Sequence, residues 1–177
     1  AGAPLLEGLG SFNFTISTDS DDAQRYFNQG MVLAFAFNHA ESVRSFQAAQ
    51  KLDPQCAMCF WGESLARGPN INVTSDGRAV MSPEDRKQAF SAYKQALYLV
   101  NPENQREKDY INALSKRYNG DITTSREPLD KQYALAMQKL VNDYPDDITA
   151  ASLYAEALMN TMPWNYWTEE GSPREDT

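Results

Sequence analysis

Histidine and positive charge are scarce in this chain of 177 residues, and each scarcity limits the functions that the protein can have. The single histidine, His39, leaves Ser-His or Cys-His catalysis only one available base. The 16 lysines and arginines are outnumbered by 24 aspartates and glutamates, which gives a net charge of −8. That balance argues against nucleic acid or an anionic membrane surface as a partner, because clustered basic residues bind both.

Long apolar runs and catalytic motifs are missing as well. No stretch of about 18 apolar residues occurs, so no membrane insertion is expected. The sequence contains no phosphate-binding glycine loop, zinc signature or nucleophile elbow. We therefore expect a protein without catalytic activity.

The composition that remains is that of a folded globular protein. Hydrophobic residues make up 42% of the chain and aromatic residues 11%, enough to form a core. The chain opens with Ala1-Gly2-Ala3-Pro4 and no initiator Met, which suits a mature exported protein or a cloning remnant. We expect a periplasmic or secreted protein, with the cytoplasm as the alternative.

A spacing of 34 residues relates two parts of the sequence. Shifting the chain by 34 places Tyr26 on Phe60 and Gly30 on Ser64, an aromatic on an aromatic and a small residue on a small one. This is the length of a tetratricopeptide repeat, a helix-turn-helix unit that buries its apolar faces by stacking on its neighbours. The register predicts paired helices, and Gly30 would allow a neighbouring helix to approach closely.

A ladder of residues at helical spacing recurs further along the chain. It appears first as Ser42, Phe46, Ala49 and Pro54, then as Ala89, Tyr93, Ala96 and Pro102, and more weakly as Tyr133, Met137, Leu140 and Pro145. Each ladder ends at a proline, which terminates helices. Residues 68–77, rich in Gly, Pro, Asn and Asp, interrupt the even spacing and predict a loop.

Cap signals and periodicity place the helices. Ser20 before two aspartates predicts one helix start, and Ser82 followed by Pro83 predicts another. Further helices are predicted over residues 106–118, 129–143 and 151–158. The last of these has no second helix to close its repeat.

Together these features predict an all-α fold, an array of about seven helices in antiparallel helix-turn-helix pairs. We divide the chain into an extended segment over residues 1–19, a repeat domain over 20–160, and an aromatic and then polar segment over 161–177. An uncovered apolar face on the last helix is unfavourable in water. The chain is therefore expected to continue into further repeats, or to cover that face with its C-terminal segment or a partner.

Four segments carry a resemblance to a known family: residues 37–41, 53–62, 68–72 and 154–159. They are similar to the tetratricopeptide repeat family, and more narrowly to a group of bacterial, often exported, repeat proteins. The resemblance covers nearly the whole chain. It implies an all-helical scaffold and no particular activity, because this fold serves many binding roles.

Cys56 and Cys59 are the sharpest local signal. Cysteines three apart at a helix start share a face, and the helix N-terminus stabilises a thiolate. Three interpretations stay open: a structural disulfide or inert pair, a metal or cofactor site for copper or haem that includes Met58, and a redox pair. Covalent c-type haem would need a histidine directly after the second cysteine, where Phe60 stands.

Two groups of apolar residues are candidate binding surfaces. Residues predicted at the inner surface of the array would either hold a hydrophobic peptide or form core: Phe27, Met31, Phe35, Trp61 and Leu65. The first two stand where the carboxylate-clamp version of the resembled family has polar residues, which argues against a clamp. Interface candidates at the C-terminal end are Trp164, Tyr166 and Trp167.

The function expected from the sequence is a scaffold for protein–protein interaction or assembly. It would bind a protein or peptide partner, with self-association as one form of this. The alternative is a carrier of haem or copper on Cys56 and Cys59. The two differ in what the native protein contains, because only a carrier would hold a chromophore or metal.

Overall fold

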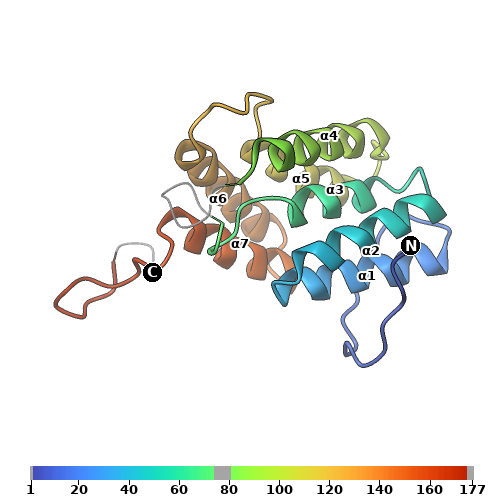
Figure 1. Cartoon of the computed structure of the whole chain (residues 1–177), viewed down its shortest axis with the longest axis horizontal. Coiled ribbons are helices and arrows are strands. Elements are labelled where there is room, and N and C mark those ends of the chain that lie inside the picture. The colour runs from blue at the N-terminus through green and yellow to red at the C-terminus, as the bar shows by residue number, and fades with distance from the viewer. Residues whose placement is uncertain (1, 74–80, 175–177) are drawn as a thin grey trace. The chain divides into compact units, whose positions relative to one another are not determined.

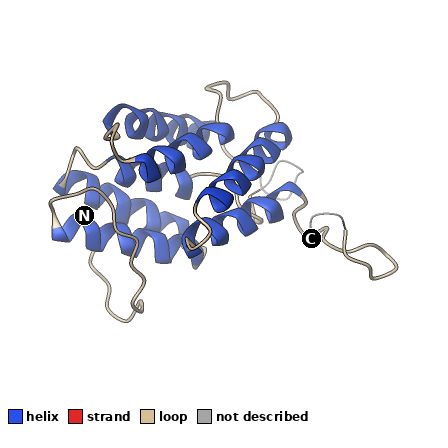
Figure 2. Cartoon of the chain, turned by 180° about the vertical axis from the view of Figure 1, so that it is seen from behind, coloured by secondary structure: helices blue, strands red, loops and turns tan. Residues whose placement is uncertain are grey.

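The computed structural model describes residues 2–73 and 81–174, and it confirms the predicted all-α fold (Figure 1). Within these residues seven α-helices pack in antiparallel pairs, joined by loops and without β-strands (Figure 2). They are α1 (Asp21–Phe35), α2 (His39–Leu52), α3 (Ala57–Ala66), α4 (Pro83–Leu99), α5 (Gln105–Leu114), α6 (Arg126–Asp143) and α7 (Ile148–Thr161), and a 3-10 turn, η1 (Ser115–Arg117), follows α5. Residues 74–77 of the predicted loop, residue 1 and residues 175–177 lie outside the described residues.

The chain forms two compact units. Unit 1 comprises residues 1–67 and 87–112, and unit 2 comprises residues 68–86 and 113–177. Unit 1 therefore contains α1, α2 and α3 with most of α4 and α5, whereas unit 2 contains α6 and α7. None of the helices in the described part of the chain is both long and apolar enough to cross a membrane.

Helix starts follow the predicted caps. The Ser20 hydroxyl accepts the backbone N–H of Ala23 at 3.2 Å, at the start of α1. The Ser82 hydroxyl accepts the N–H of Asp85 at 3.0 Å, at the start of α4. Asp147 caps α7 in the same way. Each cap gives a partner to an amide that the first turn of a helix leaves unpaired.

Two helix boundaries differ from the prediction. The predicted helix over residues 106–118 ends at Leu114 and closes with the tighter turn η1. The helix predicted from 129 begins at Arg126, because Pro128 lies in the first turn, where its missing N–H leaves no bond unmade. The periodic residues 151–158 lie within α7, which begins directly after Asp147, as expected from the residues 145–147 before it.

The ring of Phe46 on α2 lies against two glycines, Gly30 on α1 and Gly62 on α3. A Cβ added at Gly30 would stand 2.7 Å from the Phe46 ring, and one added at Gly62 would stand 2.2 Å from it. Only a residue without a side chain fits at such distances. The predicted close approach at Gly30 is confirmed.

Equivalent positions make equivalent contacts in two helix pairs of unit 1. The buried Ser42 hydroxyl donates to the Gly30 carbonyl at 2.7 Å, and the buried Ser64 hydroxyl donates to the Ala89 carbonyl at 2.8 Å. The 34-residue shift aligns Gly30 with Ser64, and the recurring ladder aligns Ser42 with Ala89. The two helix pairs thus use the same pair of aligned positions, with the donor on opposite helices.

In unit 2, α6 and α7 form a helix pair around a second core. Its apolar side chains are buried: Tyr133, Met137, Leu140, Leu153 and Ala157. Arg126 pairs with Asp130 one turn later, Nη2 to Oδ1 at 2.7 Å, and its Nη1 donates to the Arg117 carbonyl. The buried guanidinium thereby joins η1 to the first turn of α6.

Candidate functional site

Cys56 and Cys59 are joined in a disulfide at the start of α3. Cys56 precedes the helix, and both cysteines and Met58 are buried. A sulfur in a disulfide is not a thiolate, so the oxidised pair offers no ligand to copper or haem. No group of three His, Cys, Asp or Glu side chains within residues 2–73 and 81–174 is placed to hold a metal ion. The pair is thus a buried disulfide in this structure.

The residues predicted for an inner binding surface divide into two groups. Phe27, Met31, Trp61 and Leu65 are buried. Phe35, at the C-terminal end of α1, keeps 40% of its surface exposed, and its ring lies 6.1 Å from that of Phe12, centroid to centroid. The four buried residues belong to the core of unit 1. Part of what covers them comes from residues 1–19, which we call the N-terminal segment.

Phe14 of that segment lies over the aromatic residues of three helices. Its ring centroid is 5.8 Å from that of Phe27, 6.5 Å from that of Trp61 and 5.2 Å from that of Tyr110. The guanidinium carbon of Arg106 stands 4.1 Å from the Phe14 centroid, within cation–π range. Only 2% of Phe14 remains exposed. Phe14 of the chain itself thus covers Phe27 and Trp61, two of the residues predicted either to hold an apolar peptide or to form core.

The residues after Phe14 are held by α5 and the turn before it. Ile16 is buried. The Ser17 N–H donates to Oε1 of the buried Glu107 at 2.6 Å, and Asn104 Nδ2 donates to the Ser17 hydroxyl at 2.9 Å. A carboxylate that accepts a backbone N–H makes a charge-assisted bond, stronger than one between neutral groups.

Gln24 on α1 holds the backbone on both sides of Thr15. Its Nε2 donates to the Phe14 carbonyl at 2.9 Å, and its Oε1 accepts the Ile16 N–H at 3.0 Å. Asn28, one turn later, accepts the Phe14 N–H at 3.2 Å. These hydrogen bonds give partners to the backbone N–H and carbonyl groups of the extended segment, as a neighbouring β-strand would.

Gln29 repeats the arrangement five residues further along α1. Its Nε2 donates to the Pro4 carbonyl at 2.9 Å, and its Oε1 accepts the Leu6 N–H at 2.8 Å. The buried amide also donates to Ser45 on α2. Both glutamines therefore bind the carbonyl of one residue and the N–H of the residue two positions later. We call Gln24 and Gln29 the glutamine clamps.

The glutamine clamps were not predicted from the sequence. Their signal is faint, because amide side chains at helical spacing are common on exposed helix faces. Only their location opposite an extended segment distinguishes them, and that location depends on the tertiary fold.

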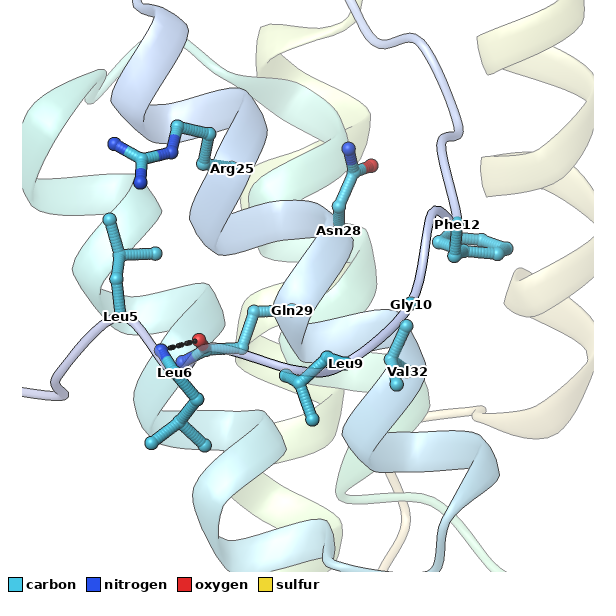
Figure 3. Close-up of a pocket in the computed structure, with 9 residues that line it drawn as sticks. All are labelled: Leu5, Leu6, Leu9, Gly10, Phe12, Arg25, Asn28, Gln29 and Val32. Carbon is cyan, nitrogen blue, oxygen red and sulfur yellow. Dashed lines mark hydrogen bonds between the residues drawn. The ribbon is translucent and has the colours of Figure 1, made fainter.

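A small cavity lies between residues 5–12 and α1, with a volume of about 170 Å³ (Figure 3). The segment contributes leucines and Phe12, and α1 contributes Arg25, Asn28, Gln29 and Val32. Cavities that bind drug-sized ligands are typically ~300–1,000 Å³. This cavity is therefore a gap beneath a looped segment, too small for most metabolites.

Unit 2 contains a polar cluster that sequence reasoning also missed. The buried Arg117 donates from Nη2 to the Pro69 carbonyl at 2.9 Å, and the same nitrogen lies 4.0 Å from Oε2 of Glu156. Its guanidinium carbon is 4.3 Å from the centroid of Tyr133. Asn160 Nδ2 donates to Glu156 Oε1 at 2.7 Å. The cluster joins the start of the 68–73 loop to α6 and α7.

Burial shifts the titration of two groups in this cluster. Burial raises the pKa of the Glu156 carboxyl above its ordinary value, although the nearby Arg117 charge and the Asn160 hydrogen bond oppose the shift. Burial likewise raises the pKa of the Tyr133 hydroxyl, again against the effect of Arg117. At neutral pH burial therefore disfavours the charged Glu156 carboxylate, and the charge of Arg117 offsets this effect only in part.

The C-terminal candidates lie at the surface of unit 2. Trp164 and Trp167 keep 55% and 59% of their surfaces exposed. The Trp164 indole N–H donates to the Ile71 carbonyl at 2.8 Å, and the Tyr166 hydroxyl donates to the Met159 carbonyl at 3.4 Å. The segment is thus attached to its own unit, with both indole rings still largely in solvent.

No protein-family model, curated protein or solved structure matches this chain.

Proposed function

We propose that this protein is a scaffold for protein–protein interaction that binds an extended polypeptide segment on the helical surface of unit 1. The binding residues lie on α1, α3 and α5. The observation that supports this proposal is the pair of glutamine clamps, each of which holds a carbonyl and the N–H two residues later.

The clamps suit extended chains of varied sequence. A glutamine side chain offers one acceptor and two donors, and here it pairs with backbone groups that every residue except proline possesses. Such bonds contribute affinity without reading side chains, as in recognition by added β-strands. The aromatic surface beneath Phe14 supplies the selectivity that backbone bonds lack.

Two further observations agree with the proposal. The resemblance to tetratricopeptide repeats implies a binding scaffold, and the paired contacts at Ser42 and Ser64 are those of a repeated helix pair. A buried disulfide suits an oxidising compartment, which favours a periplasmic or secreted protein. No comparable observation favours a haem or copper carrier.

A peptide in trans tests the proposal. The probe is a labelled peptide with the sequence of residues 9–19, and the receptor is the intact chain carrying Phe14→Ala, which weakens the chain's own occupant. Adding Gln24→Ala to that receptor removes the two hydrogen bonds from Gln24 to the segment and should weaken binding about thirtyfold, since each contributes about 1 kcal/mol.

The matched control is Gln105→Ala in the same receptor. Gln105 is exposed, and its side chain bonds to those of Asp109 and Lys108 on its own helix. Fluorescence anisotropy gives the dissociation constants. A receptor that does not bind the peptide, or one indifferent to Gln24→Ala, would contradict the proposal.

A further inference from the structure

The N-terminal segment shows which residues this surface accepts. Along it Phe14 and Ile16 are buried, whereas Thr15 and Ser17 are exposed. This alternation is that of an extended chain with one face against a surface. The side chains of Phe14 and Ile16, two positions apart, are therefore the ones buried against the surface. Thr15 between them is exposed, and its hydroxyl accepts a hydrogen bond from Asn13 of the same segment.

We propose that the partner is an extended segment in which an aromatic residue is followed two positions later by an aliphatic residue, and that it binds by displacing residues 13–18 from unit 1. This inference rests on the proposed function and names the partner class for the same site.

The aromatic preference follows from what surrounds Phe14. Its ring contacts the rings of Phe27, Trp61 and Tyr110 and lies under Arg106. A planar ring keeps the edge-to-face and cation–π contacts, which an aliphatic side chain cannot make. A basic side chain would lose its hydration there and would meet the like charge of Arg106.

The spacing follows from Gln24, and the aliphatic preference follows from the burial of Ile16. Because Gln24 holds the Phe14 carbonyl and the Ile16 N–H together, the buried residues of a bound segment stand two apart. The Ser17 N–H is also used, by Glu107. Proline is therefore excluded at the positions of Ile16 and Ser17, since it has no N–H.

The attachment of the segment sets what a partner must compete with. Ser20 already caps α1 and the Thr18 hydroxyl donates to Asp53, so only Asp19 connects the bound residues to the helix. A tether this short keeps the segment at an effective concentration on the order of millimolar or more. A partner segment must compete with that concentration, and weakening the chain's own segment should expose the site.

Four peptides test the inference against the intact Phe14→Ala chain, by fluorescence anisotropy. They are the 9–19 sequence itself and its Phe14→Ala, Ile16→Ala and Thr15→Ala forms. The parent and the Thr15→Ala peptide should bind equally, and the other two at least about tenfold more weakly. The wild-type chain should bind the parent peptide at least about tenfold more weakly than the Phe14→Ala chain does.

Each outcome has one meaning. Equal binding of all four peptides would leave the proposed function standing and overturn the aromatic and aliphatic preference. Equal affinity of the wild-type and variant chains would overturn displacement. If no peptide binds, the proposed function fails along with the inference. Circular dichroism checks the fold of the Phe14→Ala chain, and an Ile16→Ala chain, which loses fewer contacts, replaces it if it is unfolded.

Discussion

The ring of Phe46 lies so close to the backbone of Gly62 that a Cβ built on that glycine would stand 2.2 Å from the ring's Cε1. Phe46 is fully buried and cannot move into solvent to make room. The close packing of α2 on α3 therefore requires glycine at this position, and the same ring imposes the same requirement on Gly30 of α1.

Gly62→Ala should destabilise the protein even though alanine favours helices. The added methyl must displace the Phe46 ring, and such overpacking costs about 1–3 kcal/mol. Gly2→Ala is the matched control, since no atom lies within 4 Å of the Cβ it would add. Urea unfolding gives both free energies. Equal stability of the two variants would contradict the packing described here. Adding Phe46→Leu should recover part of the loss, because the smaller side chain leaves room.

Phe14→Ala should lower the free energy of unfolding by about 3–5 kcal/mol, the usual cost of removing a buried phenylalanine. Phe12→Ala, two residues earlier, removes a partly exposed ring whose described ring contact is Phe35, and should cost clearly less. Chemical denaturation of both variants measures the difference. If the two losses are the same, Phe14 does not anchor the N-terminal segment.

The cysteines should not react with a thiol reagent before reduction, in the native or in the unfolded protein, because they form one disulfide. Reductant should act slowly on the native chain, since both sulfurs are buried, and quickly after unfolding in urea. Thiol titration of the native and of the unfolded protein, each with and without reductant, measures this. Two reactive thiols in the native, unreduced protein would refute the disulfide.

Glu156→Gln should stabilise the protein relative to wild type, and this stability difference should grow as the pH rises. Because burial raises the pKa of Glu156, the folded state keeps its proton at pH values where the unfolded state has lost it. Wild-type stability therefore falls as pH rises from the ordinary pKa of 4.5 through the raised one, whereas glutamine does not titrate.

The measurement is urea unfolding of wild type and variant at a series of pH values from 5 to 8. Glu103→Gln is the control, at an exposed position. A stability difference between Glu156→Gln and wild type that does not change with pH would show that the pKa of Glu156 is not raised.

Local signals accounted for most of the helical architecture. Ser20 and Ser82 begin their helices as predicted because a cap acts within one turn, and periodicity identified the same helices that the structure has. The errors were also local. Pro128 was taken for a helix boundary, although proline fits the first turn of a helix as well as it fits the residue after its end.

The candidate site was less predictable, for a different reason. Phe27 and Trp61 were identified as apolar and helical, but their helical spacing could not show whether core, solvent or a ligand covers them. Phe14, which covers them, was missed because the alternation of apolar and polar residues over 12–17 indicates an extended chain but not the surface that its apolar face contacts. The glutamine clamps were missed because their partners are backbone atoms, which leave no mark in a sequence.

The helices, their caps and the close approach at Gly30 follow from the sequence, since they depend on neighbours a few residues away. Only the tertiary structure decided that Phe14 fills the aromatic surface and that Arg117 meets Glu156 beside Tyr133. Those contacts join residues from separate elements, and their energies depend on a burial that exists only after the helices have packed.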